Sequence, residues 1–174
     1  MDQGFGSRAA RGMRIAVYWI VVIMAVLIDQ TTKAAAREVL EEGPRMLIPG
    51  VINLVHVENT GAAFSMGQGA TALFVVIAVA FIIGATAFVW SHPNMPYYLV
   101  IPVGLVAGGG MGNMIDRIID GSVTDFISTA FMSFPVFNVA DICVTVGIIL
   151  SLLGFGFGTV KRAALGRKSK DGRV

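Results

Sequence analysis

The sequence predicts an all-α membrane protein with four transmembrane helices, and three observations lead to that fold class. The chain has 174 residues, of which 55% are hydrophobic and only 14% charged, and its mean hydropathy is +0.76. A water-soluble domain of this composition would have too little polar surface to cover itself. Four apolar segments have roughly the 20 residues that a helix needs to cross a bilayer, and basic residues gather at both ends of the chain. We therefore expect a single integral membrane domain over residues 1–174.

The first predicted span continues past its purely apolar run. The apolar residues from Ile15 to Ile28 are few for a full span, so the helix is extended through the following DQTTKAAA segment, which places Asp29 near its outer end. Basic residues precede the span but no small-residue cleavage site follows it, so we interpret it as an uncleaved helix and not as a signal peptide. The four spans are expected at residues 14–36, 71–90, 97–118 and 139–160.

Basic residues set the predicted orientation. Three arginines precede the first span and six lysines or arginines follow the fourth, together nine of the 13 basic residues. By the positive-inside rule, both termini are therefore cytoplasmic. Residues 37–70 and 119–138 are then extracytoplasmic, and the basic cytoplasmic tail at residues 161–174 is a topology signal that also contacts anionic lipid.

The first outer segment contains an alternating pattern. In VINLVHVEN, residues 51–59, the side chains of Ile52, Leu54, His56 and Glu58 point to one side and those between them to the other, which is typical of a β-strand. A small β structure on the membrane surface is expected.

The second outer segment has a turn at Asp120–Gly121, then a short β-prone run, then an aromatic stretch. Its rings are interpreted as packing residues or interfacial anchors. They are Phe126, Phe131, Phe134 and Phe137.

The third span carries glycines at helical spacing. Gly104, Gly108 and Gly112 recur every four residues, a pattern that lets a neighbouring helix approach closely. They do not indicate a nucleotide-binding loop, because GGGMGN lies inside an apolar run with no preceding strand and no following lysine. We therefore assign these glycines to helix packing.

A polar face lies beside the glycine face. Gly109, Asn113 and Arg117 share the four-residue spacing, so the Asn113 amide and the Arg117 guanidinium stack one turn apart, with Gly109 as a supporting position. A polar side chain in lipid must bond another helix or line a wet cavity, so Asn113 is a candidate site residue. The plainer interpretation of Asp116, next to Arg117, is an ion pair that caps the helix end.

Two carboxylates approach the same outer face. Asp125 lies in the second outer segment, and Asp141 lies at the start of the fourth span, three residues after Asn138. At this helix start, Asn138 suits an N-cap and Asp141 suits a capping-box acid. Capping alone would explain Asp141. Two carboxylates together at the low-dielectric edge of a bilayer cannot both ionise readily, so one would hold a proton while the other acts as a base. That arrangement suits activation of a water against an amide carbonyl.

Three further polar residues have both structural and functional interpretations. Asp29 and Lys33 are spaced i, i+4 and can pair on one face of the first span. The favoured interpretation is a salt bridge that snorkels at the interface, and the alternative is a bracing role at the site. Asn59, before Gly61, is interpreted as a turn residue that could also serve as a substrate-contacting amide.

Other chemistries are disfavoured. His56 and His92 fall on opposite sides of the membrane in this topology, so they cannot share a metal ion, and no HExxH motif occurs. Cys143 is the only cysteine, so it is expected to be a small buried apolar side chain and not part of a disulfide. No metal, cofactor or nucleic acid is expected.

Five sequence blocks extend from the first to the fourth predicted span. They are DQTTK (29–33), NTGAAFS (59–65), GGGMGNMIDR (108–117), VTDF (123–126) and FNVAD (137–141). In order and spacing, the blocks resemble those of the lipoprotein signal peptidase family, also called signal peptidase II. Five ordered blocks are a much more specific signal than any one of them.

The resemblance implies a bacterial inner-membrane aspartic endopeptidase with its active site at the extracytoplasmic face. Its substrates would be prolipoproteins, cut before a cysteine that carries diacylglycerol, and it would be blocked by the cyclic peptide globomycin. It would use no metal or cofactor, contact membrane lipid and act as a monomer. The resemblance also implies an extracytoplasmic β-cradle and a short surface helix, the latter in the aromatic stretch before Asn138.

The same resemblance assigns roles to individual residues by motif. Asp125 and Asp141 would be the catalytic dyad, and Asp29 and Lys33 a supporting pair. The positions that would line the site or hold the substrate are Asn59, Asn113, Arg117 and Asn138.

Two other classes of protein compete with this interpretation. A small transporter or proton-coupled channel would also carry membrane carboxylates with Arg and Asn partners. Transporters commonly show paired repeats with broken helices near the midplane, whereas these carboxylates cluster at one face. A membrane assembly scaffold would explain the glycines but would leave Asn113, Asp125 and Asp141 without a purpose.

Overall fold

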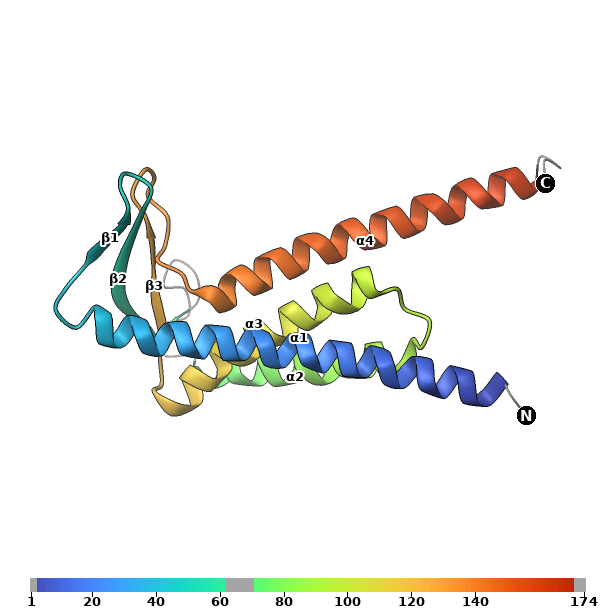
Figure 1. The fold of residues 1–174 in the computed structure, drawn as a ribbon, viewed down its shortest axis with the longest axis horizontal. Coiled ribbons are helices and arrows are strands. Elements are labelled where there is room, and N and C mark those ends of the chain that lie inside the picture. The colour runs from blue at the N-terminus through green and yellow to red at the C-terminus, as the bar shows by residue number, and fades with distance from the viewer. Residues whose placement is uncertain (1–2, 62–70, 171–174) are drawn as a thin grey trace.

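The computed structural model describes residues 3–61 and 71–170, with side chains described for residues 8–61 and 71–157. Within these ranges the chain forms four helices and a three-stranded sheet (Figure 1). The helices are α1 (Gln3–Val39), α2 (Thr71–Ser91), α3 (Tyr97–Ile119) and α4 (Val139–Lys170), and the strands are β1 (Arg45–Ile48), β2 (Ile52–Asn59) and β3 (Val123–Thr129). Residues 62–65 of the NTGAAFS block lie outside the described residues.

All four helices are long and apolar enough to cross a membrane, as the sequence predicts. The chain is therefore a multi-pass membrane protein. The helix α1 continues through the DQTTKAAA segment without a break. Outward-facing side chains such as Ile83 and Leu152 are 64% and 67% exposed, which suits contact with lipid because acyl chains are as apolar as these side chains.

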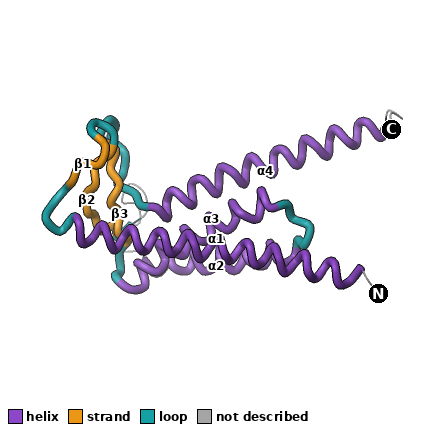
Figure 2. The backbone as a smooth tube through the Cα atoms, in the orientation of Figure 1, coloured by secondary structure: helices purple, strands orange, loops and turns teal. Residues whose placement is uncertain are grey.

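The helix α3 is central and packs against each of the other three helices. Figures 1 and 2 show α1 and α2 running together, with α4 diverging from them toward its C-terminal end. The sheet covers one end of the bundle, and both termini lie at the opposite end. The apolar core lies between the first three helices and includes the fully buried side chains of Tyr18, Val22, Val89 and Val100.

Glycines let α3 approach two of its neighbours, α1 through the predicted packing face and α4 through Gly109, which the sequence placed on the adjacent polar face. A Cβ on Gly108 would lie 2.7 Å from the Cβ of Ala25 in α1. A Cβ on Gly109 would collide with the backbone carbonyl of Ala140 in α4. Because real Cβ atoms do not come this close, the contacts require glycine at both positions.

The strands pair antiparallel in the order β1-β2-β3. The strand predicted over residues 51–59 is confirmed, but its alternation is interrupted, since the pairing with β3 shifts register between Leu54 and Val57. Such a bulge turns the following residues relative to the sheet. At the end of β2, Asn59 pairs with Val123, which brings this end of the strand beside the start of β3.

The surface helix expected in the aromatic stretch does not form there, because residues 130–138 contain no helix. Phe137 instead forms a bridge with β3. Its N–H donates to the Ile127 carbonyl at 3.0 Å, and its carbonyl accepts the Ile127 N–H at 2.8 Å. Pro135 has no N–H to contribute to a helix. The backbone of this stretch is thus committed to the sheet.

Candidate active site

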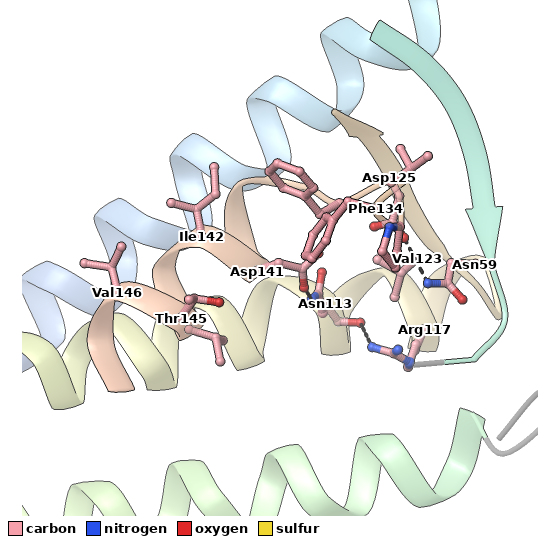
Figure 3. A pocket seen from close by; sticks show the side chains of 14 residues that line it. Asn59, Asn113, Arg117, Val123, Asp125, Phe134, Asp141, Ile142, Thr145 and Val146 are labelled. Carbon is pink, nitrogen blue, oxygen red and sulfur yellow. Dashed lines mark hydrogen bonds between the residues drawn. The ribbon is translucent and has the colours of Figure 1, made fainter. Parts of the chain in front are cut away.

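A cavity of about 450 Å³ lies at the sheet end of the bundle, beside the start of α4 (Figure 3). Its walls come from the end of β2, the last turns of α3, β3, the stretch before α4 and the first two turns of α4. The lining residues are Asn59, Asn113, Arg117, Val123, Asp125, Phe134, Pro135, Val136, Phe137, Asp141, Ile142, Val144, Thr145 and Val146. One side of the cavity is therefore polar, and the side formed by α4 and the aromatic stretch is largely apolar.

Asp125 enters the cavity from β3, with its carboxylate between two amide donors. Asn59 Nδ2 donates to Oδ2 at 2.9 Å, and Asn138 Nδ2 donates to Oδ1 at 2.7 Å. The residue is only 3% exposed, and burial raises the pKa of Asp125 to about 6. The negative charge of Asp141 also raises this pKa, whereas the two amide hydrogen bonds oppose the rise.

Asp141 enters the cavity from the first turn of α4 and forms the predicted capping box with Asn138. The Asp141 N–H donates to Asn138 Oδ1 at 3.0 Å, and the Asn138 N–H donates to Asp141 Oδ2 at 3.1 Å. Capping leaves room for a second role, because the other carboxylate oxygen accepts from Asn113 Nδ2 at 2.8 Å. Asn138, which is fully buried, thus contacts both acids.

Lys33 fixes the orientation of the Asn113 amide. Its Nζ donates to Asn113 Oδ1 at 2.8 Å, and Asn138 Nδ2 donates to the same oxygen at 3.1 Å. A lysine ammonium has only donors, so the amide oxygen must face it and the amide NH2 must face Asp141. The Asn113 amide therefore connects the Lys33 ammonium on α1 to the Asp141 carboxylate on α4.

The ion pair between Asp29 and Lys33 is buried. Both side chains are 0% exposed, and Lys33 Nζ lies 2.8 Å from Asp29 Oδ2 and 2.9 Å from Asp116 Oδ2. Asp29 Oδ1 also accepts the backbone N–H of Ala140 at 2.9 Å, which satisfies a free donor at the start of α4. The predicted salt bridge is confirmed, but its predicted place at the membrane interface is wrong, because this face of α1 meets protein and not the membrane surface. The geometry fits the alternative, a bracing role.

Asp116 belongs to the same buried cluster, and its predicted role at the end of α3 is wrong. It is 1% exposed, and its Oδ1 accepts from Gln30 Nε2 at 2.8 Å. Its Oδ2 accepts the backbone N–H of Thr124 at 3.2 Å, directly before Asp125 in β3. The carboxylate points into the protein, where it links α1 to the strand that carries the cavity acid.

A second cation holds the start of β3 from outside the cavity. Arg37 Nε donates to Thr124 Oγ1 at 2.9 Å, and Arg37 Nη2 pairs with Asp120 Oδ2 at 3.0 Å. The predicted turn at Asp120–Gly121 is confirmed, since Gly121 has a φ of 75°, a left-handed value that favours glycine.

Arg117 forms the end of the polar wall. Its Nη2 donates to the Gly61 carbonyl at 2.8 Å, and its guanidinium carbon lies 4.9 Å from the centre of the Phe74 ring in α2. The Gly61 N–H donates to Asn59 Oδ1 at 2.9 Å. Asn59 is therefore the predicted turn residue and also, through its amide NH2, the partner of the carboxylate on β3.

The sequence-predicted site residues come together at this end of the bundle. Those that line the cavity are Asn59, Asn113, Arg117, Asp125 and Asp141. Those that lie behind its wall are Asn138, Asp29, Lys33 and Gly109.

Sequence reasoning missed Gln30 and Thr124 altogether. Gln30 lies inside the DQTTK block and Thr124 inside VTDF, so their places in these blocks were the signal that could have found them. Within the described residues, no group of three or more His, Cys, Asp or Glu side chains could hold a metal ion. Two acids joined by amides, with one raised pKa, are suited to paired acid–base chemistry.

Comparison with known proteins identifies the family. The family model described as "Signal peptidase (SPase) II" matches residues 21–157. The chain is similar to a lipoprotein signal peptidase of Symbiobacterium thermophilum, with 42% identity over 138 residues, 77% of this chain and 90% of that protein. It is similar to one of Streptococcus pneumoniae, with 35% identity over 139 residues, 79% of this chain and 91% of that protein.

Two solved structures share the fold. One is described as a bacterial membrane enzyme determined by the in meso method at 2.3 Å resolution, with a TM-score of 0.76 and 28% identity over 83% of this chain and 90% of that one. The other, at 1.9 Å resolution, has a TM-score of 0.72 and 28% identity over 80% of this chain and 92% of that one. Since the family model covers most of the chain, including every residue assigned to the cavity, the chain belongs to the signal peptidase II family.

Proposed function

We propose that the chain is a membrane-embedded aspartic endopeptidase that removes signal peptides from prolipoproteins. It cleaves before a diacylglyceryl-modified cysteine, and Asp125 and Asp141 together activate the attacking water. One observation carries the proposal: two carboxylates from separate elements, β3 and α4, meet in one cavity at the end of a membrane bundle, with Asn138 bonded to both. Membership in the signal peptidase II family supports a peptidase activity.

The two acids have different surroundings, and this assigns their roles. Asp125 is the acid, because burial raises its pKa to about 6, so this carboxyl group holds a proton up to a higher pH than an ordinary aspartate does. Asp141 is the base, because its carboxylate lies at the positive end of the α4 dipole and accepts from Asn113 and from the Asn138 backbone. Different environments for two carboxylates are how one site obtains an acid and a base at the same pH.

The proposed reaction returns both acids to their starting states. Asp141 takes a proton from water as the water oxygen bonds to the scissile carbonyl carbon, while Asp125 gives its proton to the carbonyl oxygen. In the tetrahedral intermediate, Asp141 passes its proton to the leaving nitrogen and the C–N bond breaks. Asp125 takes back a proton from a hydroxyl group, which forms the carboxylic acid product.

The apolar side of the cavity suits a lipid-modified substrate. Ile142, Thr145 and Val146 lie on successive turns of α4, and Phe134 faces them from the aromatic stretch (Figure 3). Ile142 is 42% exposed, so the cavity wall continues into the outer surface of the bundle. An acyl chain could follow this surface from the membrane while the peptide reaches the acids. A soluble protease would have no comparable access to a bond beside two acyl chains.

The proposed topology follows from the charge pattern. Both termini are cytoplasmic, the active site faces the extracytoplasmic side of the bacterial inner membrane, and residues 1–174 form one membrane domain that acts as a monomer. The position of both termini at the end away from the sheet supports a common side for them. The placement of the acids at one end of the bundle favours hydrolysis over transport, since transporters bind substrates near the midplane.

The experiment that tests this function uses the purified full-length chain in detergent or proteoliposomes. A prolipoprotein with a diacylglyceryl-modified cysteine is compared with the same polypeptide without the lipid. The expected product is a lipid-modified fragment that begins at the cysteine, identified by mass, with little cleavage of the unmodified chain. Equal cleavage of both substrates, or cleavage at another bond, would contradict the proposed specificity.

A further inference from the structure

The end of the bundle away from the sheet carries a second cluster of polar side chains. Arg11 and Arg14 lie three residues apart on α1 and face the end of α2 and the start of α3. The guanidinium carbon of Arg11 lies 5.6 Å from the centre of the Trp90 ring, and that of Arg14 lies 5.3 Å from the centre of the Tyr97 ring. Figure 1 shows the start of α1 at the opposite end from the sheet, so this cluster is remote from the proposed active site.

Contacts with the protein hold both guanidinium groups in place. Arg14 Nε donates to the Met95 carbonyl at 2.7 Å, and Arg14 Nη1 donates to the Ala10 carbonyl at 2.9 Å. The aromatic rings restrict the guanidinium groups further through cation–π attraction. Arg11 Nε is buried but has no hydrogen-bond partner among the described residues. A buried charged donor without a partner is rare in proteins, so the guanidinium group of Arg11 has hydrogen-bonding capacity that its protein contacts do not use.

No carboxylate balances these charges among the described side chains. Every ion pair that those side chains form lies near the sheet end of the bundle, and none includes Arg11 or Arg14. The nearest described acid along α1 is Asp29, about 22 Å from Arg14 along the helix axis at 1.5 Å per residue. Among the described side chains, the cluster is therefore complementary to an anion that none of them supplies.

The surroundings of the cluster favour a lipid over a free anion. Trp90, Tyr97 and Tyr98 gather at helix ends, where aromatic rings mark the membrane interface. Met13 and Trp90 are 59% and 56% exposed beside the arginines. A free phosphate would contact only the guanidinium groups, whereas a phospholipid would contact these apolar side chains as well.

We propose that Arg11 and Arg14, with Trp90 and Tyr97, form a binding site for the headgroup of an anionic phospholipid. The phosphate lies against the guanidinium groups, and the acyl chains run along the exposed side chains of the neighbouring helices. The bound lipid joins α1 to the connection between α2 and α3. Both arginines precede residue 21, where the family match begins, and none of the four residues lines the proposed active site, so this site does not depend on the proposed peptidase function.

The test uses Trp90 as the probe in the full-length chain with Trp19→Phe, which leaves Trp90 as the remaining one of two tryptophans. The protein is reconstituted in phosphatidylcholine with a small, equal fraction of either brominated phosphatidylglycerol or brominated phosphatidylcholine. Bromine quenches tryptophan on contact, so we expect stronger quenching by phosphatidylglycerol. In Arg11→Gln the preference for phosphatidylglycerol over phosphatidylcholine should fall about fivefold, because that is the contribution of one basic residue near an anionic membrane surface. Arg11→Lys should retain most of it.

The matched control is Arg45→Gln in β1, which removes the same charge from an exposed ion pair with Glu42. This variant should leave the preference for phosphatidylglycerol unchanged. Circular dichroism verifies that each variant is folded. If Trp19→Phe does not fold, the Trp90 signal is obtained by subtracting the fluorescence spectrum of Trp90→Phe from that of the chain with both tryptophans. Equal quenching by the two lipids, or the same preference in Arg11→Gln, would overturn the proposal. It would also be overturned if inorganic phosphate abolished the preference where chloride of equal ionic strength did not, since the site would then bind the free anion.

Discussion

Replacement of Asn59 by alanine should shift the pH dependence of cleavage toward alkaline pH. Asn59 Nδ2 donates to the Asp125 carboxylate at 2.9 Å and holds the pKa of that group down against the effect of burial. Without this donor the charged form of Asp125 is less stable, so the pKa should rise above about 6. The proposed mechanism needs Asp125 protonated, so kcat/KM should fall as pH rises through this pKa.

The size of the shift follows from the hydrogen bond that is lost. A hydrogen bond to a charged group contributes about 1.5–3 kcal/mol, and about 1.36 kcal/mol corresponds to one pKa unit. Water entering from the cavity would replace part of the bond. The expected shift is therefore about 1 unit, which moves the alkaline limb of the profile to about pH 7.

The assay is the pH profile of kcat/KM for cleavage of a diacylglyceryl-modified prolipoprotein. The limbs of this profile report the pKa values of the free enzyme, so a role of Asn59 in substrate contact would change the height of the profile without moving the limb. The matched control is Asn53→Ala, which removes the same side chain from the same strand, at a position that pairs with Ser128 away from the cavity.

Two results would refute this reasoning. An alkaline limb that stays in place in Asn59→Ala would show that Asp125 is not the acid, or that the amide does not influence it. A limb that moves to lower pH would mean that the amide stabilises the protonated form of the carboxyl.

Further predictions concern stability. Gly109→Ala should destabilise the protein by about 1–3 kcal/mol, because the new methyl group would force α4 away from α3. Lys33→Met should cost about 3–5 kcal/mol, because it leaves buried carboxylates without their cation. Burial raises the pKa of Asp125 to about 6, so its contribution to stability is complete below about pH 4 and is lost as pH rises through 6. Asp125→Asn should therefore gain stability relative to the parent by up to about 3 kcal/mol between these pH values. Thermal and denaturant unfolding in detergent measure all three.

Each of these stability predictions has a control or a contrary outcome. Gly110 has open space around it, so Gly110→Ala should be neutral or slightly stabilising, and equal losses at both glycines would contradict the packing argument. Arg45→Met, at an exposed pair, should cost under about 1 kcal/mol, and a similar loss in Lys33→Met would mean that the buried cluster is solvated. A difference between Asp125→Asn and the parent that does not change with pH would refute the raised pKa.

The helices were predictable because membrane spans depend on local composition. A span needs about 20 apolar residues wherever it occurs, and the spacing of glycines at four residues identifies a packing face without knowledge of the partner helix. The sequence also indicated Asp125 and Asp141 as a pair, since the second outer segment and the start of the fourth span lie at the same outer face. The structure brings both into one cavity.

The environment of charged residues was less predictable. The i, i+4 spacing places Asp29 and Lys33 on one face of α1, but it does not say whether that face meets lipid headgroups or protein. The face is buried because Asp116 on α3 and the start of α4 supply its partners, and these lie far away in sequence. Asp116 was misassigned for the same reason, since its neighbour in sequence is not its partner in space.

The aromatic stretch before Asn138 does not form the expected surface helix, and the reason is different. Aromatic residues in the stretch before Asn138 were compatible with an interfacial helix, but the backbone of Phe137 hydrogen-bonds to Ile127 in β3. Pairing with a neighbouring strand overrides local preference where that strand is already present.

The most direct test of the account is cleavage by single variants of the two acids. Asp125→Asn and Asp141→Asn keep the size of each side chain but remove its ability to exchange a proton. Each is purified at full length, verified as folded by circular dichroism, and assayed with a diacylglyceryl-modified prolipoprotein in which product is detected by mass. We predict that both variants lose cleavage almost completely, with Asn53→Ala as an active control. Substantial cleavage by either folded variant would contradict the proposed dyad.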